Sequence, residues 1–283
     1  MAAPVIWRGM TRTQLDAAYN NGAAVPQGAA MVEDWTVRSA RLRARHPDGM
    51  DLVYGPRPRN RIDLFRCGAS GAPLLVFIHG GYWQHRRKEN FSVFAEGPRA
   101  RGFDVAMVGY TLAPDITVTG IVAETHAAIR WLRAQAGRLG AGQGRLVVSG
   151  WSAGGHLTAM AMALPEVDAG LAVSGLFDLE PCRLNYLNEK LKLTEAEARR
   201  MSPINAIPDR AGPLVVTYGT AELPELRRQS QAYGEVWRAA GRAGEIIPMH
   251  GDDHFSIMEK LADPHGELTT LLTRLAEPPA RRA

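Results

Sequence analysis

The sequence has few of the features that mark disulfide-rich, membrane-spanning or secreted proteins. Its 283 residues include only two cysteines, Cys67 and Cys182, which are too few for a disulfide framework and lack the spacing of a metal site. No apolar run reaches the length of a membrane span. The first ten residues contain no continuous apolar segment of the kind found in a signal peptide. We therefore expect a cytoplasmic protein that needs no metal ion and no cofactor.

The sequence also lacks a strong excess of either positive or negative charge. The 33 lysines and arginines exceed the 29 acidic residues by four, and the arginines are scattered, with no long basic block and no basic stripe interleaved with aromatics. Nucleic acid and membranes are therefore not expected as partners. We expect a small-molecule substrate and, as one option, a second copy of the chain in a homodimer. Hydrophobic residues at 46% and charged residues at 22% fit an ordinary globular domain with a sizeable core.

What the sequence does contain is a regular alternation of strands and helices. Short apolar runs predict strands at 73–78, 104–108, 146–148, 171–173, 214–218 and 245–249. Helical spacing predicts helices at 91–101, 121–139, 155–164, 224–240 and 266–275. A β-hairpin is expected from residues 50–54 and 61–66. This alternation predicts an α/β fold, in which a mostly parallel sheet has helices on both faces.

We find neither a linker nor an internal repeat, so a single domain is predicted over residues 1–283. Residues 1–45 form an N-terminal extension, with helices expected at 11–19 and 31–45 and a loop at 22–28. Such an extension is either part of a cap over a site or plain surface structure. Residues 278–283 are expected to fray.

The chemistry of the chain is indicated by the motif G-x-S-x-G at residues 150–154, which contains Ser152. It follows the apolar strand and precedes a helix rich in small residues, which is the context of a nucleophile elbow. In such an elbow the serine occupies a strained turn, and the glycines allow a tight bend. The helix that follows directs its first N–H groups at the place where negative charge develops on the substrate. The alternative is a tight turn with an inert serine.

A serine hydroxyl becomes a nucleophile only when a histidine accepts its proton. The candidates late in the chain are His250, His254 and His265. We prefer His254, because it follows a strand after a Gly-Asp-Asp turn and precedes a helical segment.

The histidine in turn needs an acid that orients it and stabilises its charged form. Glu222 follows the strand at 214–218 and is preferred, whereas Asp178 follows the strand at 171–173 and remains the alternative. The order serine, acid, histidine along the chain is that of the α/β-hydrolase fold. All of these residues follow strands, and sites in open α/β sheets form at the carboxyl ends of strands.

The strand at 73–78 leads directly into the sequence HGGYW at residues 79–83. Its glycines allow the backbone to come close to a substrate oxygen, so we expect an oxyanion hole made by the N–H groups of Gly80, Gly81, Tyr82 and Ala153. His79 is expected to brace this loop and not to transfer protons.

These motifs resemble those of arylformamidases (kynurenine formamidases), α/β-hydrolases related to the hormone-sensitive-lipase-type esterases. The similarity is carried by HGGYW, by SGLFDLEP at 174–181, by ELPELRRQS at 222–230 and by His254-Phe255, and it extends over roughly residues 50–275. The resemblance implies a serine hydrolase that converts N-formyl-L-kynurenine to L-kynurenine and formate in tryptophan catabolism. Two positions depart from the family pattern. Trp151 stands where many members have histidine, which bears on the substrate, and Glu222 stands where the acid is commonly aspartate.

Aromatic residues near the strand ends bear on the choice of substrate. We predict that Tyr82, Trp83, Tyr110 and Trp151 contact an aryl ring, although each would serve equally well as packing beneath a cap. Three functions remain open: an arylformamidase, a general carboxylesterase on short acyl esters, and a non-catalytic α/β-hydrolase-fold binding protein. The presence of Ser152, Glu222 and His254 together argues against the third.

Overall fold

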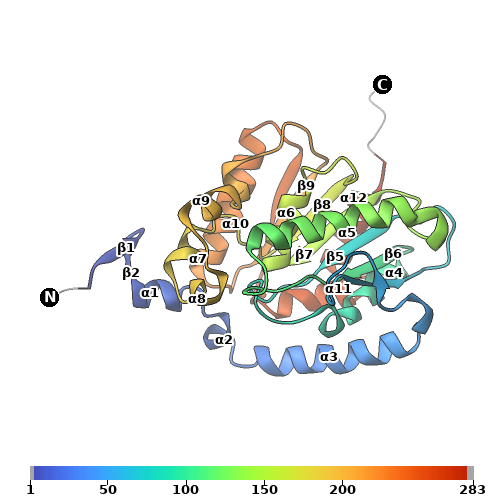
Figure 1. Cartoon of the computed structure of the whole chain (residues 1–283), viewed down its shortest axis with the longest axis horizontal. Coiled ribbons are helices and arrows are strands. Elements are labelled where there is room, and N and C mark those ends of the chain that lie inside the picture. The colour runs from blue at the N-terminus through green and yellow to red at the C-terminus, as the bar shows by residue number, and fades with distance from the viewer. Residues whose placement is uncertain (1–2, 279–283) are drawn as a thin grey trace.

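The computed structural model describes residues 3–278, and its main feature is an eight-stranded sheet (Figure 1). Its strands are β3 (Leu52–Val53), β4 (Arg61–Phe65), β5 (Leu74–Ile78), β6 (Asp104–Val108), β7 (Leu146–Trp151), β8 (Ala169–Val173), β9 (Leu214–Gly219) and β10 (Gly244–Met249). The spatial order is β10-β9-β8-β7-β5-β6-β4-β3. The neighbouring strands β10, β9, β8, β7, β5 and β6 are parallel to one another. At the edge, β4 is antiparallel to β6, and β3 is antiparallel to β4. The predicted α/β-hydrolase fold is confirmed, with the predicted hairpin at its edge.

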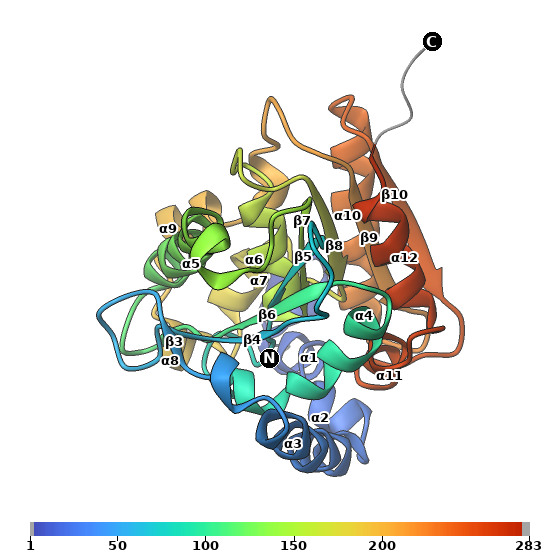
Figure 2. The same cartoon turned by 90° about the vertical axis from the view of Figure 1, so that its right-hand side faces the viewer.

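Helices cover both faces of this sheet (Figure 2). They are α1 (Arg12–Ala17), α2 (Asn21–Ala24), α3 (Gly28–Ala44), α4 (Glu96–Ala100), α5 (Val118–Leu139), α6 (Ala153–Ala161), α7 (Glu180–Leu184), α8 (Asn188–Leu191), α9 (Glu195–Arg200), α10 (Pro224–Ala239), α11 (Glu259–Ala262) and α12 (Glu267–Ala276). Short 3-10 helices lie at Pro47–Gly49, Lys88–Asn90, Ser92–Ala95, Pro203–Asn205 and Ser256–Met258. A separate two-stranded hairpin, β1 (Val5–Trp7) with β2 (Met10–Thr11), precedes α1.

Successive strand residues divide the core into two layers, because side chains alternate between the faces of a sheet. On β5, Val76 packs in the layer formed with α5, α6 and α10. Its neighbour Phe77 packs in the layer formed with α3, α11 and α12. Since both layers pack on one sheet, we infer that the chain forms one domain. None of the helices among residues 3–278 is both long enough and apolar enough to span a membrane.

Some elements differ from the prediction. The helix expected at 91–101 is a 3-10 turn followed by the short α4, whose Gly97 lies against the backbone: a Cβ there would be 2.3 Å from the Leu261 carbonyl oxygen. The loop expected at 22–28 contains α2, because the side chain of Asn20 accepts a hydrogen bond from the Ala23 N–H and caps that turn. The β1–β2 hairpin was not predicted. Residues 279–283, which the sequence predicts to fray, lie outside the described residues.

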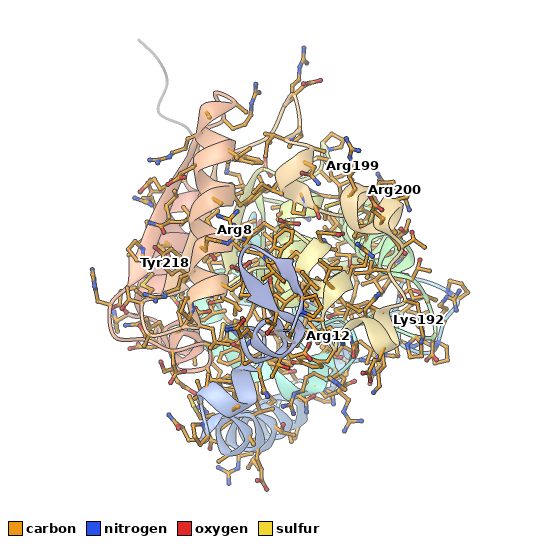
Figure 3. The ribbon with its side chains drawn as sticks, turned by 90° about the vertical axis from the view of Figure 1, so that its left-hand side faces the viewer. Arg8, Arg12, Lys192, Arg199, Arg200 and Tyr218 are labelled. Carbon is orange, nitrogen blue, oxygen red and sulfur yellow. The ribbon has the colours of Figure 1, made fainter. Side chains whose placement is uncertain are left out.

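The strand order creates the place for a site. After β5 the chain goes to β6 on one side and then to β7 on the other, so a crevice opens at the carboxyl end of β5. The N-terminal segment lies at this end of the molecule, where α1 contacts α7. Figure 3 shows the hairpin with Arg8, and α1 with Arg12, in front of the sheet.

Candidate active site

Ser152 occupies a strained turn between β7 and α6. Its backbone angles are φ 59° and ψ −117°, which non-glycine residues rarely adopt. This conformation costs about 1–3 kcal/mol, which the surrounding structure must offset. The flanking glycines lie where no side chain fits. A Cβ on Gly154 would be 1.9 Å from the Ile78 carbonyl oxygen, and one on Gly150 would be 2.4 Å from the Gly154 carbonyl oxygen. The turn therefore has the geometry of the predicted nucleophile elbow, with Ser152 at the first turn of α6.

His254 lies between the serine and an acid. Its Nε2 is 3.1 Å from Ser152 Oγ, and its Nδ1 is 2.9 Å from Glu222 Oε2. Because an ionised carboxylate only accepts hydrogen bonds, Nδ1 carries the proton and Nε2 is free to accept that of the serine. All three side chains are buried. The other candidates, His250 and His265, are exposed at the surface.

The carboxylate of Glu222 is held by two further donors. Its Oε1 accepts hydrogen bonds from Ser174 Oγ and from the Gly219 N–H, each at 2.6 Å. Gly219 packs against the loop after β10, since a Cβ there would be 2.1 Å from the Asp252 carbonyl oxygen. The two loops that carry the acid and the histidine are thus pressed together. Ser174 was not singled out as a site residue, although it begins the SGLFDLEP segment that carries the family resemblance.

The alternative acid, Asp178, has a different role. Its Oδ1 accepts the N–H of Glu180 at 3.1 Å, which caps the turn at the start of α7. Of the two acids that the sequence left open, Glu222 faces the histidine and Asp178 does not.

The loop after β5 lies directly against the serine. A Cβ on Gly80 would be 3.0 Å from the Ser152 Cβ, so only glycine permits this approach. Gly81 has a φ of 117°, which again favours glycine. Within residues 3–278, the N–H groups of Gly80, Gly81, Tyr82 and Ala153 form no hydrogen bond with a protein acceptor. These amides are available to a substrate oxygen, as the predicted oxyanion hole requires.

His79 supports this loop from inside the protein. Its ring stacks on Tyr110, with 4.3 Å between the ring centroids, and its Nδ1 donates to the Gly80 carbonyl oxygen at 2.8 Å. Complete burial lowers the pKa of His79 to about 3, because the interior disfavours the charged imidazolium. A neutral, buried histidine braces the loop and transfers no proton at neutral pH.

His156, in α6, is a second buried neutral histidine. Its Nδ1 accepts the indole N–H of Trp83 at 3.2 Å, and its Nε2 donates to the Met201 carbonyl oxygen at 2.8 Å. Burial lowers its pKa to about 4. Protonating Nδ1 would place its N–H group against the indole N–H of Trp83, so that two donors would face each other. These surroundings therefore disfavour the charged form of His156.

Because His79 and His156 are buried in the neutral form, we predict that the folded protein loses stability as the pH decreases. Unfolding returns each to a pKa near 6.5, so the unfolded chain binds more protons below that pH and the free energy of unfolding falls as the pH decreases. Between pH 7 and pH 5 each histidine is expected to remove about 2 kcal/mol. Urea unfolding over this range measures the slope, and His156→Gln, which keeps the donor to Met201, should flatten it. An unchanged slope in that variant would contradict this assignment.

Three of the four aromatic residues predicted to contact an aryl ring are buried. Trp83 and Tyr110 have no exposed surface, and the hydroxyl of Tyr110 donates to the His79 carbonyl oxygen at 2.9 Å. The indole of Trp151 donates to the His254 carbonyl oxygen at 2.8 Å, and its ring centroid is 4.9 Å from that of His254. These residues lie beneath the site and support its loops. Burying a large ring whose polar atom finds an internal acceptor is favourable, and the sequence alone does not distinguish this from a ring that faces a cleft.

Tyr82 is the exception, because it connects the oxyanion loop to the N-terminal segment. Its hydroxyl donates to the Tyr19 carbonyl oxygen at 2.6 Å and accepts from Asn21 Nδ2 at 3.0 Å. The hydroxyl of Tyr186 donates to the same Tyr19 carbonyl at 3.2 Å. No local sequence signal marks Tyr19 or Asn21 as site residues, since they reach the loop only through the tertiary fold.

Removing the Tyr82 hydroxyl should loosen the oxyanion loop without unfolding the protein. We expect Tyr82→Phe to lower kcat by about tenfold, because one or two hydrogen bonds of about 1 kcal/mol each hold a residue at an unfavourable φ of 49°. Tyr186→Phe is the matched control, since it removes a hydrogen bond to the same carbonyl but does not touch the loop. Equal losses of kcat in Tyr82→Phe and Tyr186→Phe would show that the Tyr82 hydroxyl stabilises only the N-terminal segment and not the oxyanion loop.

Comparison with known proteins finds similar hydrolases. The profile of the BD-FAE family matches residues 63–218. Kynurenine formamidase from Danio rerio is 29% identical, over 95% of this chain and 98% of its own. A crystal structure from Silicibacter sp. TM1040, described as a candidate thioesterase, is 31% identical with a TM-score of 0.83, over 92% of this chain and 99% of that chain. Esterase LipC of Mycobacterium tuberculosis is 27% identical, over 68% of this chain and 55% of its own. A formamidase, a thioesterase and an esterase are all hydrolases.

Proposed function

Because the chain belongs to the BD-FAE family and has the α/β-hydrolase fold, we propose that it hydrolyses a small aryl formamide, with N-formyl-L-kynurenine as the preferred substrate. The products are L-kynurenine and formate, which places the reaction in tryptophan catabolism. The observation that carries the proposal is the hydrogen-bonded series Ser152–His254–Glu222 beside a glycine loop. The similarity to kynurenine formamidases over nearly the whole chain supports the formamide as substrate.

In the proposed reaction, His254 Nε2 accepts the proton of Ser152 as Oγ attacks the formyl carbon. The carbonyl oxygen becomes an oxyanion, which accepts hydrogen bonds from N–H groups of the predicted oxyanion hole, at Gly80, Gly81, Tyr82 and Ala153. The C–N bond then breaks, and the leaving aryl amine takes the proton from His254. Water, deprotonated by the same histidine, attacks the formyl carbon of the formyl-enzyme. The ester bond to Ser152 Oγ then breaks, formate leaves, and His254 returns its proton to Oγ. Glu222 keeps Nδ1 of His254 protonated and stabilises the imidazolium in both the acylation and the deacylation step.

The tight packing of the oxyanion loop favours a small acyl group. Gly80 approaches the Ser152 side chain so closely that even a methyl group on Gly80 would have to displace its neighbours. A formyl group has no carbon beyond the carbonyl and fits the smallest acyl space. A butyryl group brings three more carbons and needs more space beside Ser152.

The main alternative is a carboxylesterase on short acyl esters, which uses the same residues and is favoured by the similarity to Esterase LipC. The non-catalytic binding protein has no observation in its favour, since its function would not need the hydrogen-bonded histidine and acid. We also propose that the N-terminal segment forms part of the cap, because Tyr19 and Asn21 contact the oxyanion loop. This assigns part of residues 1–45 to the site and not to plain surface structure.

Substrate preference tests the proposal. We expect kcat/KM for N-formyl-L-kynurenine to exceed that for p-nitrophenyl butyrate, and p-nitrophenyl acetate to be cleaved faster than the butyrate, because binding energy holds the small acyl carbon next to Ser152. The measurement is initial rates with all three compounds on one preparation. Faster hydrolysis of the butyrate than of both others would contradict the formamidase and favour the esterase.

A further inference from the structure

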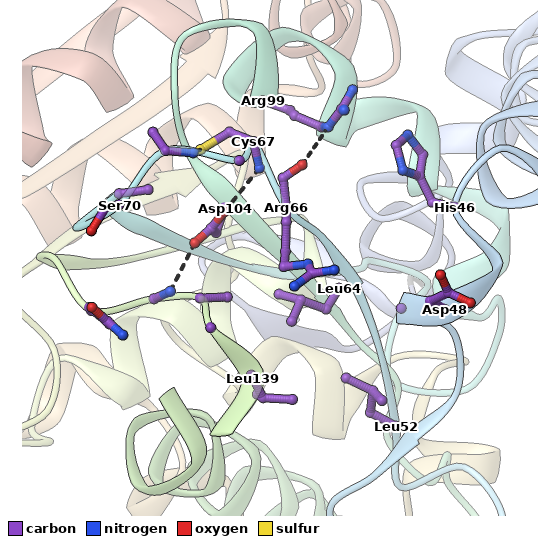
Figure 4. Close-up of a pocket in the computed structure, with 18 of the residues that line it drawn as sticks. His46, Asp48, Leu52, Leu64, Arg66, Cys67, Ser70, Arg99, Asp104 and Leu139 are labelled. Carbon is purple, nitrogen blue, oxygen red and sulfur yellow. Dashed lines mark hydrogen bonds between the residues drawn. The ribbon is translucent and has the colours of Figure 1, made fainter. Parts of the chain in front are cut away.

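A hollow lies at the opposite end of the sheet from Ser152, and Figure 4 shows the residues that line it. It has a volume of about 890 Å³ and is lined by residues from 45–49, 66–72 and 138–143. The segment at 66–72 precedes β5, and that at 138–143 precedes β7, so the hollow is at the amino ends of these parallel strands. Ser152, in contrast, follows the carboxyl end of β7. We call this hollow the amino-end cavity.

The amino-end cavity combines an apolar part with a basic rim. Leu52, Leu64 and Leu139 line it, and Figure 4 shows them together on one side. The other lining residues include four arginines: Arg45, Arg66, Arg99 and Arg138. Its volume falls in the range of sites for small organic molecules.

The acidic side chains nearby are fixed by other contacts or lie at the edge of the cavity. Asp104 is buried, and its two oxygens accept the N–H groups of Cys67 at 3.0 Å and Gly142 at 2.9 Å. It therefore joins two loops and forms no ion pair with these arginines. Arg45 forms an ion pair of 2.6 Å with Glu96. Asp48 is exposed at the edge of the cavity.

For the other three arginines of the cavity, no carboxylate within residues 3–278 lies at ion-pair distance. Arg99 donates its Nε to the Arg66 carbonyl oxygen at 2.8 Å, which leaves its terminal N–H groups for another acceptor. Two arginines also complement the end of α5, since Arg138 is in its last turn and Arg66 Nη1 would lie 3.8 Å from a Cβ on Gly140. That role accounts for neither Arg99 nor the apolar side of the cavity. The pKa of His46 is lowered by burial and by the nearby charges of Arg99 and Arg45, as expected where positive charge accumulates.

We propose that the amino-end cavity binds a small organic anion, with an apolar ring or chain against the leucines and a carboxylate, sulfonate or phosphate between Arg66, Arg99 and Arg138. Guanidinium groups bind such oxyanions through paired, charge-assisted hydrogen bonds. The site is separate from the hydrolytic one and does not depend on the substrate proposed there. It would let a metabolite bind while Ser152 is occupied.

Fluorescence titration with 8-anilinonaphthalene-1-sulfonate tests the proposal, because this probe has an apolar ring system and one anionic group. We expect one saturable site per chain, retained after Ser152 is blocked by phenylmethylsulfonyl fluoride and weakened by added inorganic phosphate. The double variant Arg66→Ala/Arg99→Ala should raise Kd by at least about tenfold. Its hydrolysis of p-nitrophenyl acetate should stay near the wild-type rate.

The matched control is Arg210→Ala/Arg238→Ala, which removes the same charge from exposed positions outside the cavity and should change Kd by less than about twofold. Arg138→Ala, at the exposed end of α5, should raise Kd by about threefold and serves as the test if the double variant does not fold. An unchanged Kd in the cavity variants, an equal loss in the control, or loss of binding on blocking Ser152 would each overturn the proposal.

Discussion

Replacing Ser152 with alanine is expected to lower kcat/KM by at least about 10³-fold while leaving the protein folded. The hydroxyl is the group that His254 Nε2 faces at 3.1 Å, and alanine leaves no nucleophile at this position. Stability should change little, because alanine keeps the Cβ and the positive φ of the native turn. Steady-state rates on N-formyl-L-kynurenine and on p-nitrophenyl acetate, with thermal unfolding of the same samples, measure both effects.

Ser149→Ala is the matched control for that experiment. Ser149 lies on β7, three residues before Ser152, and is also buried, but its hydroxyl donates to the Leu171 carbonyl oxygen at 2.8 Å and not to the histidine. We expect it to lose about 1 kcal/mol of stability and to keep its activity. A folded Ser152→Ala protein with near-normal rates would contradict the proposed mechanism for both the formamide and the ester.

The second large effect is expected for Glu222→Gln, which should lower kcat by about 10³–10⁴-fold. The structure gives a specific reason. Ser174 Oγ and the Gly219 N–H both donate to one oxygen of Glu222, so a glutamine would place its carbonyl oxygen there and its NH₂ group toward His254 Nδ1. Two donors would then face each other, and the imidazole would move its proton to Nε2. In that tautomer the histidine does not accept the proton of Ser152.

Asp178→Asn is the control for the acid, since asparagine keeps the oxygen that caps the turn before α7. We expect its kcat to stay within about threefold of wild type, because the substitution leaves the charge beside His254 in place. The pH dependence of kcat/KM should keep its shape in Asp178→Asn and change in Glu222→Gln. A larger loss in Asp178→Asn than in Glu222→Gln would reverse the assignment.

Local patterns in the sequence were enough to predict the sheet and the elbow. Runs such as Leu74–Ile78 and Leu214–Gly219 are apolar because both faces of a central parallel strand are covered, and that composition is visible without a structure. The motif around Ser152 is equally local, because its glycines are required by contacts within the strand–turn–helix unit and with the adjacent strand.

Choices among equivalent candidates needed the tertiary structure. Glu222 and Asp178 both follow strands, and only the packing of the β9 and β10 loops shows which carboxylate meets His254. Trp83 and Tyr110 follow strands and Trp151 ends one, which led us to expect contact with an aryl ring, yet all three side chains are buried in the structure.

By itself, the sequence determined the α/β-hydrolase fold, the strained serine turn and the glycine loop, because each depends on the properties of neighbouring residues. Only the tertiary structure decided which acid orients the histidine, which aromatic rings are buried, and that Tyr19 and Asn21 hold the oxyanion loop through Tyr82. Those contacts join segments separated by tens of residues along the chain. Their geometry depends on how helices and loops pack on the sheet, which no local pattern of residues encodes.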